Sequence, residues 1–177
     1  MKKILLGIFM LLCIVSCGSG PDATVSKFIN SVKAEKMKEA AKYAIDDSFE
    51  GNLDIKYNTK IQELLFKTLL KNLEYKIVKS EKQDNETTIV TVEVTNVDVE
   101  KIFLQVFKKM TQETFTSNGT HSLSVEDRFK EELEAKEKPK SKNVTKFVVK
   151  KTANGEKIVL TAENIDVLLG KLNTTLS

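Results

Sequence analysis

The spacing of apolar residues changes from helical to alternating at Leu73, and this change constrains the fold more than any other feature of the chain. Before Leu73, apolar residues recur at intervals of three and four, which is typical of helices with one buried face. After it, Tyr75 and Ile77 alternate with charged residues, and a second alternating run follows a polar turn. Because one face of each run is polar, we predict an antiparallel hairpin that is covered on one side only.

Three helices are predicted before this hairpin. Pro21 fits the first turn of the first helix, because a helix start leaves its N–H groups unbonded and proline has none. A second, shorter helix runs from Met37 to Ala44 and ends near Asp46, and a loop over residues 49–58 precedes the third. Their apolar positions are Val25, Phe28, Ile29 and Val32; Met37, Ala40, Ala41 and Ala44; and Ile61, Leu64, Leu65 and Leu69.

Two further helices follow the hairpin. Asp98 is predicted to cap the fourth helix, and Asn118 and Gly119 are predicted to end it. Ser124 is predicted to open a fifth, more charged helix, because Ser124 and Asp127 have the spacing of a capping box. The apolar positions of the fourth helix are Ile102, Phe103, Val106, Phe107 and Met110.

A second hairpin and a closing helix complete the predicted order. The hairpin runs from Asn143 to Leu160 and turns at Asn154 and Gly155, a pair that tolerates positive φ. The closing helix has Ile165, Leu168, Leu169 and Leu172 on one side.

This order lacks the regular strand–helix alternation of a parallel sheet. We therefore predict a single α+β domain over residues 21–177, with residues 98–138 as a helical insertion between two strand pairs.

The first sixteen residues have the features of a secretory leader. Lys2 and Lys3 precede an apolar run from Ile4 to Val15. A membrane-spanning helix needs about 20 apolar residues, so this run is too short to be a comfortable anchor.

The sequence Ile14-Val15-Ser16-Cys17-Gly18 resembles the bacterial lipobox. In lipobox proteins the leader is cut before the cysteine, which receives a diacylglyceryl group. The resemblance implies a signal peptide over residues 1–16, a lipidated Cys17 with acyl chains such as palmitate, and a tether over residues 17–20. It also implies an extracytoplasmic protein anchored to a membrane of the bacterial cell envelope. Cys13 is a poorer site, because bulky residues precede it.

Removal of the leader would leave 26 basic and 25 acidic side chains, a nearly neutral balance with interspersed signs. Such a chain has no global field that attracts nucleic acid, so we predict no nucleic-acid partner. With Cys17 bound to lipid and Cys13 removed, no disulfide can form within one chain. Thiol catalysis is excluded for the same reason.

Four segments carry a second resemblance: residues 21–29, 37–44, 75–77 and 90–96. In this order they resemble uncharacterised bacterial lipoproteins with a cystatin-like, NTF2-like (lumazine-binding-like) domain. The resemblance implies a curved antiparallel sheet packed on the N-terminal helices, a shape that can enclose a ligand cavity. The inserted segment 98–138 could cover the mouth of such a cavity.

The sequence is compatible with two kinds of binding surface. One is a cavity lined by Phe28, Phe66, Tyr75 and Phe103, although helically spaced aromatic residues more often simply pack in a core. The other is a protein-contact face on the inserted helices. We therefore predict a membrane-anchored, non-catalytic module that binds an envelope protein or a small apolar ligand. The alternative is an acid/base enzyme with an NTF2-like cavity.

Reactive constellations are sparse. His121 is the only imidazole, so no histidine-rich metal site is expected, and we predict no metal and no cofactor. Asp46, Asp47 and Glu50 lack the pattern of a calcium loop and indicate a turn after the second helix. The stretch 136–142 could touch anionic headgroups, but its mixed charges favour a solvated linker.

Overall fold

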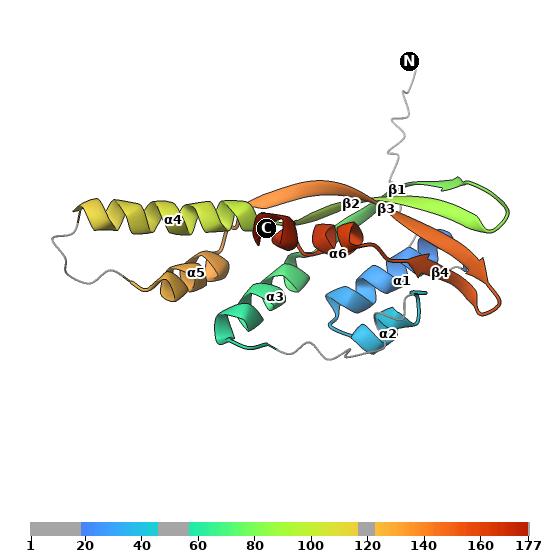
Figure 1. The fold of residues 1–177 in the computed structure, drawn as a ribbon, viewed down its shortest axis with the longest axis horizontal. Helices are drawn as coiled ribbons and strands as arrows, with labels where there is room; N and C mark the ends of the chain where they lie inside the picture. The colour runs from blue at the N-terminus through green and yellow to red at the C-terminus, as the bar shows by residue number, and fades with distance from the viewer. Residues whose placement is uncertain (1–18, 46–56, 117–122, 177) are drawn as a thin grey trace, which may run out of the picture.

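The computed structural model describes residues 19–45, 57–116 and 123–176, and it confirms the predicted α+β class. One antiparallel sheet has the order β1-β2-β3-β4, and helices lie before, within and after it (Figure 1). The strands are β1 (Glu74–Lys82), β2 (Thr87–Val97), β3 (Lys140–Thr152) and β4 (Gly155–Val159). The helices are α1 (Pro21–Lys33), α2 (Met37–Ala41), α3 (Lys60–Asn72), α4 (Val99–Thr116), α5 (Val125–Glu134), α6 (Ala162–Leu168) and α7 (Leu172–Leu176).

Strand register divides the sheet into an inner and an open face, because successive side chains point to opposite sides. Val90 pairs with Phe147 and Val92 with Thr145, and these residues belong to the inner face. Thr91 pairs with Lys146, and this row belongs to the open face. The open face consists mainly of Glu74, Lys76, Lys79 and Glu81; Ile89, Thr91, Glu93 and Thr95; Lys142, Val144, Lys146, Val148 and Lys150; and Val159.

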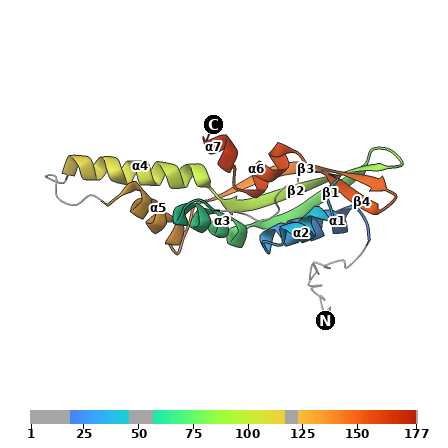
Figure 2. The same cartoon turned by 60° about the horizontal axis from the view of Figure 1, so that its bottom comes forward.

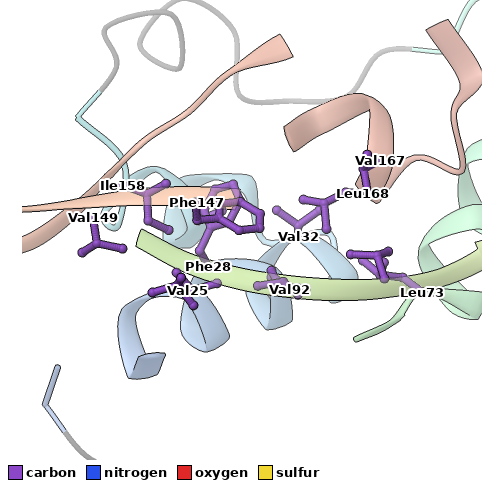
Figure 3. Close-up of a cluster of buried hydrophobic side chains, with 14 of the residues drawn as sticks. Val25, Phe28, Val32, Leu73, Val92, Phe147, Val149, Ile158, Val167 and Leu168 are labelled. Atoms are coloured by element: carbon purple, nitrogen blue, oxygen red, sulfur yellow. The ribbon is translucent and has the colours of Figure 1, made fainter. Parts of the chain in front are cut away.

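The main core lies between α1 and the inner face. Phe28 of α1 and Phe147 of β3 are both fully buried, and their rings meet edge to face with centroids 6.2 Å apart (Figure 3). Val167 and Leu168 of α6 join the same cluster. Burial of each large apolar side chain contributes about 1.5–3 kcal/mol, so this contact stabilises the fold and sets the position of α1.

A second cluster lies where the sheet meets α4. It combines Leu69 of α3, Ile102 of α4, Leu133 of α5 and Leu172 of α7, all buried. Four helices that are remote in sequence therefore meet at one end of the sheet.

The second helix is shorter than the sequence predicts. It ends at Ala41, and residues 43–45 instead run beside β4. The N–H of Ile158 donates to the carbonyl of Tyr43 at 2.7 Å, and the N–H of Ile45 donates to the carbonyl of Ile158 at 2.9 Å. Residues after Ala41 therefore bond the edge strand β4 instead of continuing the helix.

Both sheet edges are irregular. At the outer edge of β1, the register shifts between Ile77 and Lys79, so Val78 forms a β-bulge. At the other edge, the bridge between Ala44 and Ile158 extends the sheet beyond β4 by one short parallel contact.

The predicted closing helix is two helices. It is interrupted at Gly170 and Lys171, which adopt φ of 66° and 65°. Gly170 is buried, and a Cβ added to it would lie 2.4 Å from the carbonyl oxygen of Val97. After this break, Asp166 accepts a bond from the N–H of Asn173 at 2.7 Å and so caps α7.

The caps predicted for the fourth and fifth helices are confirmed. Asp98 accepts a bond from the N–H of Lys101 at 3.0 Å, and Ser124 accepts one from the N–H of Asp127 at 3.1 Å. The second hairpin turns one residue earlier than predicted, at Ala153 and Asn154, and Gly155, at φ 95°, is the first residue of β4. Strand β3 begins three residues early, at Lys140. The segment 140–142 is therefore strand rather than linker.

We expect Gly170→Ala to lower the free energy of unfolding by at least about 2 kcal/mol, because it forces an L-residue into the left-handed region and against a backbone carbonyl. Gly155→Ala is the matched control. It also has positive φ but meets open space, so we expect a loss of roughly 1 kcal/mol. Urea unfolding measures both values, and equal losses would contradict the close contact at Gly170.

Candidate functional site

Helices α4 and α5 pack together and extend beyond the end of the sheet, and we name this pair the arm (Figure 2). The rings of Phe103 and Phe129 meet edge to face with centroids 4.5 Å apart. Arg128 of α5 has a side chain that is only 14% exposed, and it pairs with Glu113 of α4. Its guanidinium also lies 2.7 Å from Glu131. Apolar contact and a mostly buried cation therefore both hold α5 against α4.

The outer side of α4 carries large apolar side chains that no described element covers. Leu104, Phe107 and Phe115 are 58%, 70% and 84% exposed. The two phenylalanines follow Leu104 by three and eleven positions, so all three share one side of the helix. Ile102 and Val106 are buried on the opposite side. We name Leu104, Phe107 and Phe115 the α4 stripe.

Two exposed lysines lie beside the α4 stripe. Lys101 precedes Leu104 by one turn, and Lys108 follows it by one turn. The ammonium of Lys101 lies 2.8 Å from the carboxylate of Asp98, and this contact raises the pKa of Lys101 above its ordinary value. Both lysines therefore border the stripe on the exposed side of the helix.

The open face of the sheet is rich in lysine. Lys140 bonds Glu74 at 2.8 Å and thereby lowers the pKa of that carboxyl, and Lys142 lies 3.3 Å from Glu93. Val144, between these charges, is 56% exposed. This face carries more exposed lysines than glutamates. The six lysines are Lys76, Lys79, Lys140, Lys142, Lys146 and Lys150, and the three glutamates are Glu74, Glu81 and Glu93.

A small apolar cleft lies between the helices on the other side of the sheet. Its volume is about 150 Å³, and its lining atoms are all apolar. Drug-sized ligands usually occupy pockets of about 300–1,000 Å³, so the cleft has room only for a short alkyl group. It is lined by Val32, Met37, Phe66, Leu70, Ile165, Leu168 and Leu169.

The four aromatic residues predicted to line a cavity lie in different places. Phe28 is fully buried in the main core, and the half-buried Tyr75 donates to the carbonyl of Ser26 at 3.4 Å. Phe103 lies in the arm. Phe66 alone of the four lines the apolar cleft. The structure therefore does not bring the four rings together.

Two carboxylates of the described residues are buried, and both have partners within the fold. Asp166 caps α7, and Glu132 of α5 pairs with Lys109 of α4. Across residues 19–45, 57–116 and 123–176, His, Cys, Asp and Glu nowhere gather in a group of three that could hold a metal. Within the same ranges, every helix is too short or too polar to cross a bilayer.

Several predicted positions lie outside the described residues. Cys17 is one of them, as are the acidic residues Asp46, Asp47 and Glu50 and the lone His121. They remain predictions from the sequence.

The exposure of the α4 stripe was not predicted. The sequence assigned Phe107 to the buried side of the fourth helix, together with Ile102 and Val106, whereas the structure exposes it. The available signal was that apolar residues occur all around this helix, more than one neighbouring element can cover.

We expect Arg128→Met to loosen the arm, because it removes the guanidinium that pairs α5 with Glu113 of α4. The free energy of local opening of α5 should fall by roughly 1–3 kcal/mol. Amide hydrogen exchange of α5 measures this change, with the exposed Lys130→Met as control. Unchanged exchange in Arg128→Met would contradict the role assigned to this cation.

Comparison with known proteins gives one distant structural likeness. Neither the family models nor the curated proteins contain a match to this chain. Among solved structures, a candidate lipoprotein (ycdA) from Bacillus subtilis is similar with a TM-score of 0.40 and 15% sequence identity. The match covers 85% of this chain and 47% of that one, so this chain spans about half the length of the solved protein. A likeness at this level does not establish a shared fold or function.

Proposed function

We propose that this chain is a bacterial lipoprotein, anchored at the cell envelope through a diacylglyceryl group on Cys17, and that its body is a non-catalytic binding module. The observation that carries the proposal is the order of its first segments: a basic start, an apolar run and Ser16-Cys17-Gly18. Helix α1 begins at Pro21, so only residues 18–20 separate the lipidated cysteine from the folded body.

The short link determines where the body works. A fully extended chain spans at most about 3.6 Å per residue, so Cys17 and Pro21 lie within roughly 14 Å of each other. The body then rests beside the bilayer, and its exposed arm and open face lie within reach of the membrane surface. We also propose the cystatin-like, NTF2-like class for this body, and the packing of α1 against an antiparallel sheet supports it.

We expect Cys17→Ser to keep the leader attached and to remove the lipid, because the modified thiol is absent. Mass spectrometry of the N-terminal peptide from producing cells measures both changes. Cys13→Ser is the matched control and should be processed and lipidated normally. A wild-type peptide with a bare Cys17 thiol would contradict the proposal.

The apolar cleft favours a second candidate function, the binding of a short alkyl chain. The favouring observation is that its lining atoms are all apolar, including those of half-buried Phe66 and Met37. The alternative of an acid/base enzyme has no comparable support. The buried carboxylate of Asp166 accepts a hydrogen bond from the N–H of Asn173, and that of Glu132 pairs with Lys109.

A decanoate titration followed by thermal unfolding tests this second function. We expect a saturable rise in Tm for the wild type, because a ligand that binds only the folded state stabilises it. Leu169→Trp should abolish the rise by filling the cleft. Leu65→Trp, at a half-buried position of α3 outside the cleft, is the control. A rise that survives Leu169→Trp would exclude the cleft as the site.

A further inference from the structure

Two exposed surfaces, the α4 stripe and the open face, lie on the same side of the molecule. Helices α1, α2 and α3 lie beneath the sheet in Figure 1, and α5 lies beneath α4. The stripe points away from the buried residues Ile102 and Val106, and so away from α5. The side of the sheet that α1 leaves uncovered is therefore also the side to which the stripe points.

This shared side has the chemistry that binds a membrane surface. Interfacial helices combine phenylalanine and leucine on one strip with bordering lysines, as Leu104, Phe107 and Lys108 do. The open face adds six exposed lysines against three glutamates. Lys76 and Lys146 have no ion-pair partner among the described residues. Anionic headgroups complement this excess of positive charge.

The position of α1 allows the lipid tether and this side to meet one bilayer. Ser80 donates a hydrogen bond to Asp22 in the first turn of α1. Ser80 belongs to β1, the edge strand, and lies on the inner face, so the chain enters the fold beside this edge of the sheet, on the side where α1 packs. Ser80 also pairs with Val90, which lies seven residues before Val97, where β2 ends next to α4. The tether and the α4 stripe thus lie toward opposite ends of the sheet.

We propose that the α4 stripe and the open face together contact a bilayer rich in anionic phospholipid, with Phe107 and Phe115 inserted at headgroup level. This orientation rests on the proposed lipid anchor. A second copy of the chain is a poorer occupant, because a symmetric contact would bring two lysine-rich faces together.

The chain contains no tryptophan, so one introduced tryptophan reports its own surroundings without background. The full-length Phe115→Trp variant is purified from the membranes of producing cells and reconstituted into vesicles. The vesicles consist of phosphatidylcholine and phosphatidylglycerol with brominated acyl chains. We expect its fluorescence to fall at least about twofold relative to vesicles without bromine, because the side chain enters the interface. Lys71→Trp, at an exposed position of α3 on the other side of the sheet, is the control, and its fluorescence should not be quenched. Equal fluorescence of Phe115→Trp in both vesicles would overturn the proposal.

The contribution of charge is tested in the Phe115→Trp background. Lys76→Gln with Lys146→Gln should reduce quenching by about half in vesicles with phosphatidylglycerol, because it removes two unpaired cations. Lys38→Gln with Lys71→Gln removes the same charge from α2 and α3 and should leave quenching unchanged. An equal effect of the two pairs would overturn the assigned orientation.

Two further readouts separate the possible failures. Protection of Phe115→Trp from aqueous iodide without quenching by brominated lipid, together with dimer sedimentation, would assign the stripe to a second copy and overturn the proposal. The N-terminal mass is measured on the same sample. A bare Cys17 thiol together with quenching of Phe115→Trp would contradict the lipid anchor but support the proposed orientation. A lipidated Cys17 without quenching would support the anchor and overturn the orientation.

Discussion

The contact between Phe28 and Phe147 is the constraint on which the other features depend. It joins the first helix to the third strand across most of the chain, and both rings are fully buried. Because strand side chains alternate, a β3 that places Phe147 toward α1 must place Lys146 and Val148 on the opposite face. A shift by one residue would bury lysine and expose phenylalanine. The same contact therefore fixes the core, the identity of the open face and the point where the chain enters the fold.

The arm is inserted without disturbing this sheet. Strands β2 and β3 pair from Thr87 to Val97, although α4 and α5 lie between them in the sequence. At the base of the arm, the N–H of Asp98 donates to the carbonyl of Pro139 at 2.8 Å. The two chain segments that enter and leave the arm are thus hydrogen bonded where they diverge. Residues beyond this junction can extend away from the sheet while the strand register remains intact.

Local periodicity was sufficient to predict most of the fold. The stripe containing Phe28 and Ile29 and the alternation of Val90, Val92 and Val94 each predicted the correct element and its buried side. The break at Gly170 was not predictable in this way, because it depends on the remote carbonyl of Val97. The candidate surface was also missed, since exposure of Phe107 depends on where α5 packs rather than on the spacing within α4. The aromatic residues chosen as a cavity lining have the same spacing as ordinary core residues, and spacing alone cannot distinguish the two.

The irregular edges of the sheet affect how readily neighbouring copies of the chain can associate when they are crowded together. Strands with free, straight edges can join strands of neighbouring molecules into continuous sheets. Here the bulge at Val78 distorts one border, and the backbone of residues 43–45 occupies part of the other. Many copies confined to a two-dimensional layer would collide often, at high local concentration. Blocked borders would let such copies remain separate molecules instead of polymerising.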